Sequence, residues 1–170
     1  SFYISKDASI AKWTFHSISR DKYALTAGGE YLRIDDSSLK MTAEFDENCV
    51  FTIEPGTGSN KGKIKLTGAG SRGIAFSSNA FKTVASTSAS WLNMAEDSVY
   101  GDDDFVEYYA RKISVSDRDN MHDGCQVIIY TRLWNETDKE YEFYAVDQDG
   151  NLVRVYESGD DIVWIGTQRR

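Results

Sequence analysis

The densest group of metal-ligand side chains in the sequence is the segment Asp117–Gly124, which reads DRDNMHDG. Asp117, Asp119 and Asp123 place three carboxylates within seven residues, and Ca²⁺ prefers such hard oxygen donors. Met121, in the middle of the segment, is a poor ligand for a hard cation. The segment therefore predicts weak calcium binding at most, and we expect no other cofactor.

Aromatic residues beside amides are the second chemical signal. Sugar rings stack on the faces of Trp and Tyr, and neighbouring Asn or Asp side chains bond their hydroxyl groups. Large aromatic side chains also dominate protein cores, and for any single tryptophan the core interpretation is favoured. The candidate ligand-binding residues are Trp91, Asn93, Tyr100, Trp134 and Asn135.

The segment Asp147–Gly150 (DQDG) resembles the start of a calcium loop. An EF-hand needs further oxygen ligands and a bidentate Glu at its twelfth position, and this segment does not continue in that way. Asp bonds its own backbone and Gly adopts positive φ, so the same letters favour a tight hairpin turn. We therefore interpret Asp147–Gly150 as a structural turn and not as a metal site.

Catalytic signatures are weak. The sequence contains no G-x-S-x-G, P-loop or dinucleotide-binding motif. His122 and Cys125 with His16 and Cys49 are the only His and Cys residues, and their spacing indicates neither a zinc site nor a nucleophilic pair. We predict a non-catalytic protein. The alternative is a small secreted glycoside hydrolase that uses two of the 27 acidic residues as a carboxylate pair.

Composition narrows the class of partner. The chain has 170 residues, a formal net charge of −8 and a pI near 4.8, so a nucleic-acid backbone would be repelled by most of its surface. No apolar run approaches the ~20 residues of a membrane span, so we expect no membrane insertion. Cys49 and Cys125 are either a disulfide or two buried thiols, and the sequence does not choose between them.

The pattern of short alternating segments predicts a single all-β domain over residues 1–170. About a dozen strands are expected, because β-branched and aromatic residues alternate between Gly-, Asn- and Asp-rich turns. We expect Glu96–Asp104 (EDSVYGDDD) to be an acidic surface loop. The expected strands are Trp13–Ile18, Tyr23–Leu25, Tyr31–Ile34, Leu39–Ala43, Cys49–Ile53, Lys63–Leu66, Gly73–Phe76, Trp91–Met94, Phe105–Val115, Val127–Trp134, Tyr141–Val146, Leu152–Tyr156 and Ile162–Ile165.

Three stretches share a strand, a Gly-containing turn and a second alternating strand. They are YALTAGGEYLRID from Tyr23, IKLTGAGSRGIAF from Ile64 and FYAVDQDGNLVRVY from Phe143. Units that cannot bury their own faces alone can close around a pseudo-threefold axis. We therefore predict a β-trefoil-like domain, with a β-sandwich or barrel as the alternative.

YALTAGGEYLRI running on to FTIEPG, and FYAVDQDGNLVRVYESGDDIVWIG, resemble trefoil-like modules in large surface proteins of Gram-positive gut bacteria. Such proteins often also carry collagen-adhesin or pilin-type (Cna-B/SpaA) domains. The resemblance implies an extracellular or cell-wall-associated fragment of a longer protein, with adhesive or structural work. Its expected partners are a glycan or host surface protein and other domains of the same chain. A pilin-like module stiffened by a Lys–Asn isopeptide bond is a further alternative.

Overall fold

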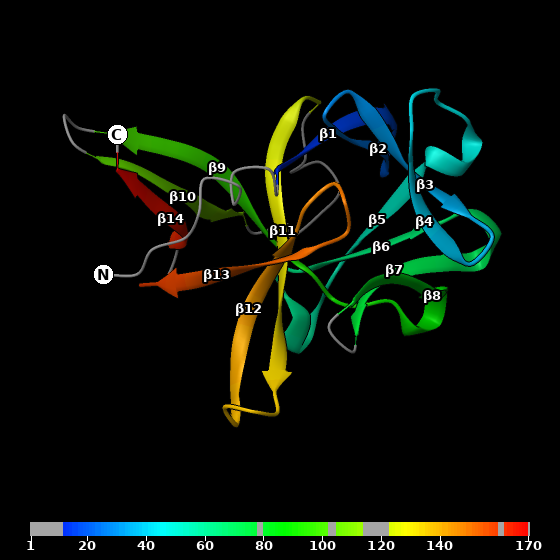
Figure 1. The fold of residues 1–170 in the computed structure, drawn as a ribbon. Coiled ribbons are helices and arrows are strands. Elements are labelled where there is room, and N and C mark those ends of the chain that lie inside the picture. Colours follow the sequence, from blue (N-terminus) through cyan, green and yellow to red (C-terminus); the bar gives the residue numbers. More distant parts are fainter. Residues whose placement is uncertain (1–11, 78–79, 102–104, 114–122, 160–161, 170) are drawn as a thin grey trace.

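The computed structural model describes residues 12–77, 80–101, 105–113, 123–159 and 162–169. These residues form an all-β protein whose 14 strands belong to one continuous antiparallel sheet (Figure 1). Helical structure in the described residues is limited to short 3-10 turns such as Glu47–Cys49. The strands are β1 Lys12–Ser19, β2 Lys22–Ala27, β3 Glu30–Asp35, β4 Ser38–Thr42, β5 Phe51–Pro55, β6 Ile64–Gly68, β7 Arg72–Ser77, β8 Ala80–Ala85, β9 Asn93–Gly101, β10 Phe105–Ile113, β11 Cys125–Asn135, β12 Glu140–Val146, β13 Leu152–Ser158 and β14 Ile162–Arg169.

The C-terminal half closes into a barrel of six strands in the order β12-β13-β14-β10-β9-β11, because β11 also pairs with β12. The N-terminal half continues the sheet from β11 through β1, β2, β5, β6, β7 and β8, and the β3–β4 hairpin branches from β2. Figure 1 shows β11 between these two halves. All-β architecture is confirmed, and a barrel is present.

Strand β11 is buried on both faces and separates two cores. Val127 and Ile129 point into the larger core, and Ile128 and Tyr130 point into the barrel. This alternation follows from the two-residue period of a strand. The barrel core consists of Ala95, Ala110, Ile128, Tyr130, Ala145, Val155 and Val163.

Trp13 ties the two halves together. Its side chain is 1% exposed within the larger core, and its indole Nε1–H donates to the backbone oxygen of Val146 over 3.0 Å. Since a buried indole N–H needs an acceptor, this bond fixes β1 against the end of β12.

The two free ends of the ladder, β4 and β8, are joined by side chains. Thr83 on β8 donates through Oγ1 to the backbone oxygen of Ser37 over 2.7 Å. Arg72 Nη2 donates to both the backbone oxygen and Oγ1 of Thr83, each over 3.0 Å. β4 and β8 therefore lie close together without a paired ladder among the described residues.

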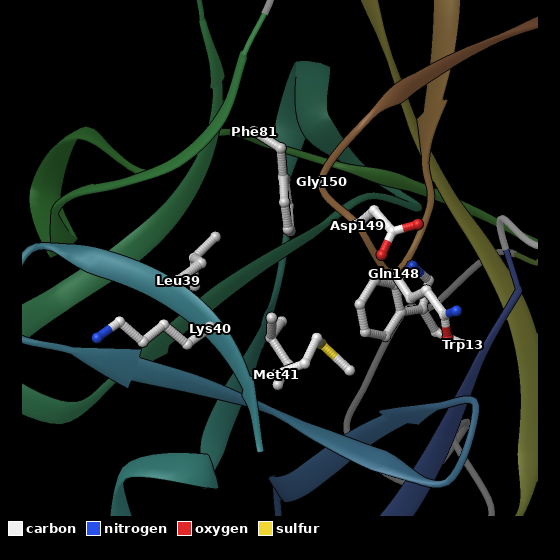
Figure 2. Close-up of a pocket in the computed structure, with 9 residues that line it drawn as sticks. Trp13, Leu39, Lys40, Met41, Phe81, Gln148, Asp149 and Gly150 are labelled. Atoms are coloured by element: carbon white, nitrogen blue, oxygen red, sulfur yellow. The ribbon is translucent and has the colours of Figure 1, made fainter. Parts of the chain in front are cut away.

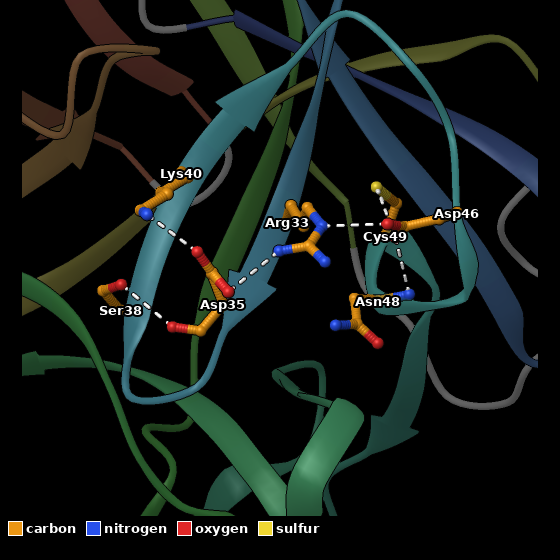
Figure 3. Close-up of polar contacts among 7 residues, drawn as sticks. All are labelled: Arg33, Asp35, Ser38, Lys40, Asp46, Asn48 and Cys49. Atoms are coloured by element: carbon orange, nitrogen blue, oxygen red, sulfur yellow. Dashed lines mark hydrogen bonds and ion pairs between the residues drawn. The ribbon is translucent and has the colours of Figure 1, made fainter.

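The β3–β4 hairpin is held by a network of charged side chains (Figure 3). Arg33 contacts Asp35 over 3.1 Å and Asp46 over 3.0 Å, and Lys40 contacts Asp35 over 2.7 Å. These hydrogen bonds lower the pKa of both carboxyl groups. The bond from Lys40 is the main cause for Asp35, and the bond from Arg33 is the main cause for Asp46. Asp46 also accepts from the backbone N–H of Asn48, so the network caps the 3-10 turn beside the hairpin.

The three stretches with a shared pattern all form hairpins: β2–β3, β6–β7 and β12–β13. The first two surround the larger core and the third belongs to the closed barrel. Each expected strand overlaps a strand of the structure, and the segment that begins at Phe105 is strand β10.

The prediction of a loop over Glu96–Asp104 is wrong for Glu96–Gly101, which belongs to β9. Arg111 is the cross-strand neighbour of Glu96 on β10, and opposite charges in such a position favour the pairing of two strands. Residues 102–104 lie outside the described residues. Acidic composition alone therefore gave the wrong structure for this segment.

Two tryptophans provide a matched test of this core. Trp13→Ala is expected to lower the free energy of unfolding by about 3–5 kcal/mol, because it empties a buried site. Trp134→Ala, at a side chain that is 46% exposed, is expected to cost less than about 1.5 kcal/mol. Urea unfolding of both variants measures the difference, and equal losses would contradict this assignment of buried and exposed positions.

Candidate functional site

The largest exposed aromatic side chains of the described residues meet at one end of the β11–β12 hairpin. Trp134 is 46% exposed and Tyr141 is 56% exposed, and the two residues are directly opposed in the ladder. Their ring centroids are 4.9 Å apart at an interplanar angle of 70°, a favoured edge-to-face geometry. We call this pair the aromatic platform. Figure 1 shows that its hairpin projects beyond the neighbouring strands.

Both rings of the platform are fixed by charged neighbours. Trp134 Nε1 donates to Glu136 Oε2 over 2.5 Å, and Glu136 is also paired with Lys139. The guanidinium carbon of Arg132 lies 4.1 Å from the Tyr141 ring centroid, within cation–π range. The rings are therefore held in place while much of their surface stays in solvent.

A charged network on the other face of the hairpin stiffens it. Glu142 is 3% exposed and accepts from Asn135 over 2.7 Å, from Tyr144 over 2.8 Å and from Arg154 over 2.5 Å. The hydrogen bonds from Asn135 and Tyr144 are the main reasons why the pKa of Glu142 lies below its usual range, and Arg154 adds to them. Arg154 also stacks over the ring of Tyr156, with its guanidinium carbon 4.6 Å from the centroid.

A hollow of about 440 Å³ lies at the same end of the hairpin and is bordered by Trp134. Tyr144 and Leu152, which also line it, belong to the face of the hairpin opposite the two platform rings. The lining residues are Trp134, Asn135, Glu136, Thr137, Tyr144 and Leu152.

Trp134 is 46% exposed, so the core interpretation is wrong for it. Asn135 lies in the same hollow, but its amide builds the turn. Asn135 Oδ1 accepts from the backbone N–H groups of Thr137 and Asp138 over 2.9 and 3.0 Å, and its Nδ2 group donates to the carboxylates of Asp138 and Glu142. Asn135 is therefore a positioning residue for the platform.

The other predicted binding residues are not brought to the platform. Trp91 is half-buried, with Lys65 Nζ 4.6 Å from its ring centroid. Asn93 borders a different hollow, with Lys63 and Lys112. The side chain of Tyr100 lies outside the described residues.

The proposed calcium ligands Asp117 and Asp119 also lie outside the described residues. Asp123 is described, and its Oδ1 accepts from the backbone N–H of Ser17 over 2.8 Å. It therefore anchors the end of β1. A separate group of carboxylate oxygens, from Asp138, Glu140 and Glu142, lies within 4.8 Å of one another, but the donors already bound to Glu142 neutralise that carboxylate.

The remaining candidate residues have structural contacts. Asp147 is 4% exposed, and its Oδ1 accepts from the backbone N–H groups of Asp149 and Asn151 over 2.9 and 2.8 Å. The DQDG segment is therefore the turn that the sequence predicts. Cys49 and Cys125 are buried free thiols in this structure, and burial raises the pKa of each. A buried thiol with a raised pKa is a poor nucleophile.

Tyr141, Glu142 and Arg154 are not among the residues that the sequence predicts for a site. A usable signal existed for Tyr141, because the turn after Asn135 places it opposite Trp134 if the two strands pair symmetrically. Arg154 lies on a third strand and meets Glu142 only when β12 and β13 pair.

No protein-family model matches this chain, and no curated protein sequence is detectably similar to it. Within the described residues, none of the helical segments has the length and hydropathy needed to cross a membrane.

The charge of Glu142 gives a test by pH. A lowered pKa means that this group stabilises the fold above its unfolded pKa of about 4.3, and that the contribution is lost as pH falls through the lower folded pKa. Glu142→Gln is therefore expected to melt below wild type at pH 7, and the gap is expected to narrow as pH falls from 5 to 3. Thermal denaturation monitored by circular dichroism measures it.

Glu140 is exposed and is the first residue of β12, so it provides the matched control. Glu140→Gln is expected to melt close to wild type throughout this pH range, because surface substitutions usually change stability by less than about 0.5 kcal/mol. A gap for Glu142→Gln that stayed constant with pH would contradict the ionised role of Glu142.

Proposed function

We propose that this protein is a non-catalytic extracellular surface module that binds a glycan through its aromatic platform. The observation that carries the proposal is the exposed pair Trp134–Tyr141, fixed by Glu136 and Arg132 at the end of a projecting hairpin. Exposed aromatic side chains held in one orientation lose little conformational entropy when a ligand binds. Clustered exposed apolar surface of this kind marks interaction sites.

The charge around the platform narrows the glycan class. Three exposed acids on the same hairpin, Glu136, Asp138 and Glu140, outnumber its two exposed cations, Arg132 and Lys139, and the whole chain carries −8. This field repels sulfated or carboxylated sugars. We therefore propose neutral sugars as the ligand class.

The cellular location of the protein is part of the same proposal. Resemblance to trefoil-like modules supports a cell-wall-associated position within a longer adhesin-like chain, where the domain also acts as a spacer. For the fold, a closed six-strand barrel is the feature shared with a β-trefoil, although all six strands, β9 to β14, come from the C-terminal half of this chain. The competing hydrolase hypothesis needs a carboxyl group with a raised pKa as proton donor, whereas the pKa of the buried Glu142 is lowered, which suits an ion-pair partner.

A glycan array screened with wild-type protein, with and without calcium, tests the proposal. We expect binding to neutral glycans, and at least about a tenfold loss for Trp134→Ala, because a stacking aromatic side chain is typically a main contributor to binding energy. Dependence on calcium would assign a role to the segment that contains Asp117, Asp119 and Asp123. An array without hits would contradict glycan binding.

Phe45→Ala is the matched control for this screen. Phe45 is an aromatic side chain with 45% exposure and packs edge to face on Tyr31 with centroids 5.4 Å apart. The Phe45→Ala variant therefore removes an exposed aromatic ring at a position outside the platform. Binding that fell equally in Phe45→Ala and Trp134→Ala would contradict a specific role of the platform.

A further inference from the structure

One end of the six-strand barrel is lined mainly by polar side chains. On each of β9 to β13, the residue two positions from a buried barrel residue continues the barrel-facing side of its strand. Because neighbouring strands are antiparallel, these positions meet at the same end of the barrel. They border a hollow of about 410 Å³, which we call the barrel mouth. The five residues are Asn93, Lys112, Arg132, Phe143 and Glu157.

Lys63 joins the barrel mouth from the N-terminal half of the chain. A backbone bridge brings the two segments together, since Ile64 N–H donates to the oxygen of Leu92 over 2.9 Å and Leu92 N–H donates to the oxygen of Ile64 over 2.7 Å. The bridge holds Lys63 and Asn93, the chain neighbours of this pair, at the same hollow. Three cationic side chains from separate strands or segments therefore border it: Lys63, Lys112 and Arg132.

Among the described lining residues, Glu157 is the one carboxylate, and its Oε2 is already occupied. It accepts from Lys112 Nζ over 2.6 Å and from the hydroxyl group of Tyr130 over 2.9 Å. Burial is the main cause that raises the pKa of Tyr130, so its hydroxyl group stays protonated and remains a donor. Three cations against one carboxylate leave an excess of two positive charges at the barrel mouth.

The cations of the barrel mouth keep N–H groups for a ligand. The ammonium group of Lys112 has three donors, and Glu157 accepts only one of them. The side chains of Lys63 and Asn93 make no hydrogen bond or ion pair with any described residue, and Arg132 makes only a cation–π contact with a tyrosine ring. The barrel mouth is therefore rich in donors that the fold itself does not use.

The negative net charge of the chain acts weakly at this position. At physiological ionic strength, charges separated by more than about 8 Å are largely screened, so a ligand in the barrel mouth mainly meets the lining residues. The exposed acids of the β11–β12 hairpin, Glu136, Asp138 and Glu140, lie around its projecting end and do not line the barrel mouth. An anion at the barrel mouth is therefore compatible with neutral sugars at the platform.

The hollow beneath the β12–β13 turn, of about 380 Å³, lacks these properties (Figure 2). Trp13 and Leu32 line it but are only 1% and 3% exposed, so they offer a ligand almost no apolar surface. Lys40 is paired with Asp35, and Figure 2 shows its ammonium group directed away from Trp13. Asp149 contributes a single exposed carboxylate, which does not make a binding site.

We infer that the barrel mouth binds a compact oxyanion, namely a phosphate or sulfate group. Lys63, Lys112 and Arg132 surround the anion, and the amide of Asn93 donates a further hydrogen bond. Phosphate and sulfate offer several acceptor oxygens, and charge-assisted hydrogen bonds to them are stronger than neutral ones. The mouths of β-barrels are frequent ligand sites. This inference does not rest on glycan binding at the platform.

The test is a titration with sodium sulfate and sodium phosphate at neutral pH, with ionic strength held constant by sodium chloride. NMR follows the side-chain amide of Asn93, assigned by comparison with Asn93→Ser, and the backbone N–H of Lys112. We expect saturable shifts with a dissociation constant of about 1–10 mM, as a few exposed charge-assisted hydrogen bonds provide. Sodium acetate, with one negative charge, is expected to bind at least about threefold more weakly.

Glycerol 3-phosphate, with glycerol as its neutral control, distinguishes two sources of the same group. Tighter binding of glycerol 3-phosphate than of inorganic phosphate would assign the site to an esterified phosphate. Equal or weaker binding would assign it to the free ion. Glycerol alone is expected to cause no saturable shift.

Lys63→Met removes one cation and keeps the aliphatic stem. It is expected to weaken sulfate binding about two- to fivefold, as expected for the loss of one partly exposed charge. Lys61→Met is the matched control, because Lys61 is exposed two residues earlier and does not line the barrel mouth. Lys61→Met is expected to bind sulfate as wild type does.

Glu157→Gln tests the sign of the charge. It removes the carboxylate and frees the ammonium group of Lys112, so sulfate is expected to bind about two- to fivefold more tightly. Glu140→Gln removes the same charge outside the barrel mouth and is expected to leave the affinity unchanged. Circular dichroism checks the fold of all four charge variants.

Four results would overturn the inference. They are the absence of a saturable shift within about 50 mM sulfate, equal losses of affinity in Lys63→Met and Lys61→Met, weaker sulfate binding by Glu157→Gln, and a shift confined to the indole of Trp134. The anions used here contain no sugar ring, so failure of this inference and failure of the glycan screen are separate outcomes.

Discussion

The structure depends on the burial of both faces of β11. Even-numbered residues such as Ile128 and Tyr130 fill the barrel, and odd-numbered residues such as Val127 and Ile129 fill the larger core. A one-residue slip in register would exchange the two sets. Each core therefore fixes the register for the other. The pairing of β11 with β9 on one edge, and with β1 and then β12 on the other, follows from this shared wall.

The same alternation explains the aromatic platform. Arg132 and Trp134 continue the even-numbered face of β11 that lines the barrel, but they lie past its last layer of core residues. Across the ladder, Tyr141 continues the face of Ala145 in the same way. A barrel-facing side chain beyond the end of the barrel has no core to enter. The platform is thus the exposed continuation of an interior face, fixed by charged neighbours instead of by packing.

The local features of this fold could be predicted from the sequence, and the long-range ones could not. Strand alternation and turn residues located the hairpins, including the turn at Asp147, because these signals act over a few residues. The burial of Trp13 and the exposure of Trp134 depend on which distant strands pair. The acidic residues of Glu96–Gly101 led to the wrong prediction of a loop, because Arg111, the cross-strand neighbour of Glu96, belongs to a different strand.

The acidic residues of this protein have several structural uses. Asp123 and Asp147 accept hydrogen bonds from backbone N–H groups. Asp46 and Glu142 accept hydrogen bonds from charged or polar side chains. Hydrogen bonds occupy oxygen atoms of these carboxylates, so they have fewer free acceptor positions for a ligand. Asp149 differs, because the turn fixes its backbone and leaves its carboxylate in solvent.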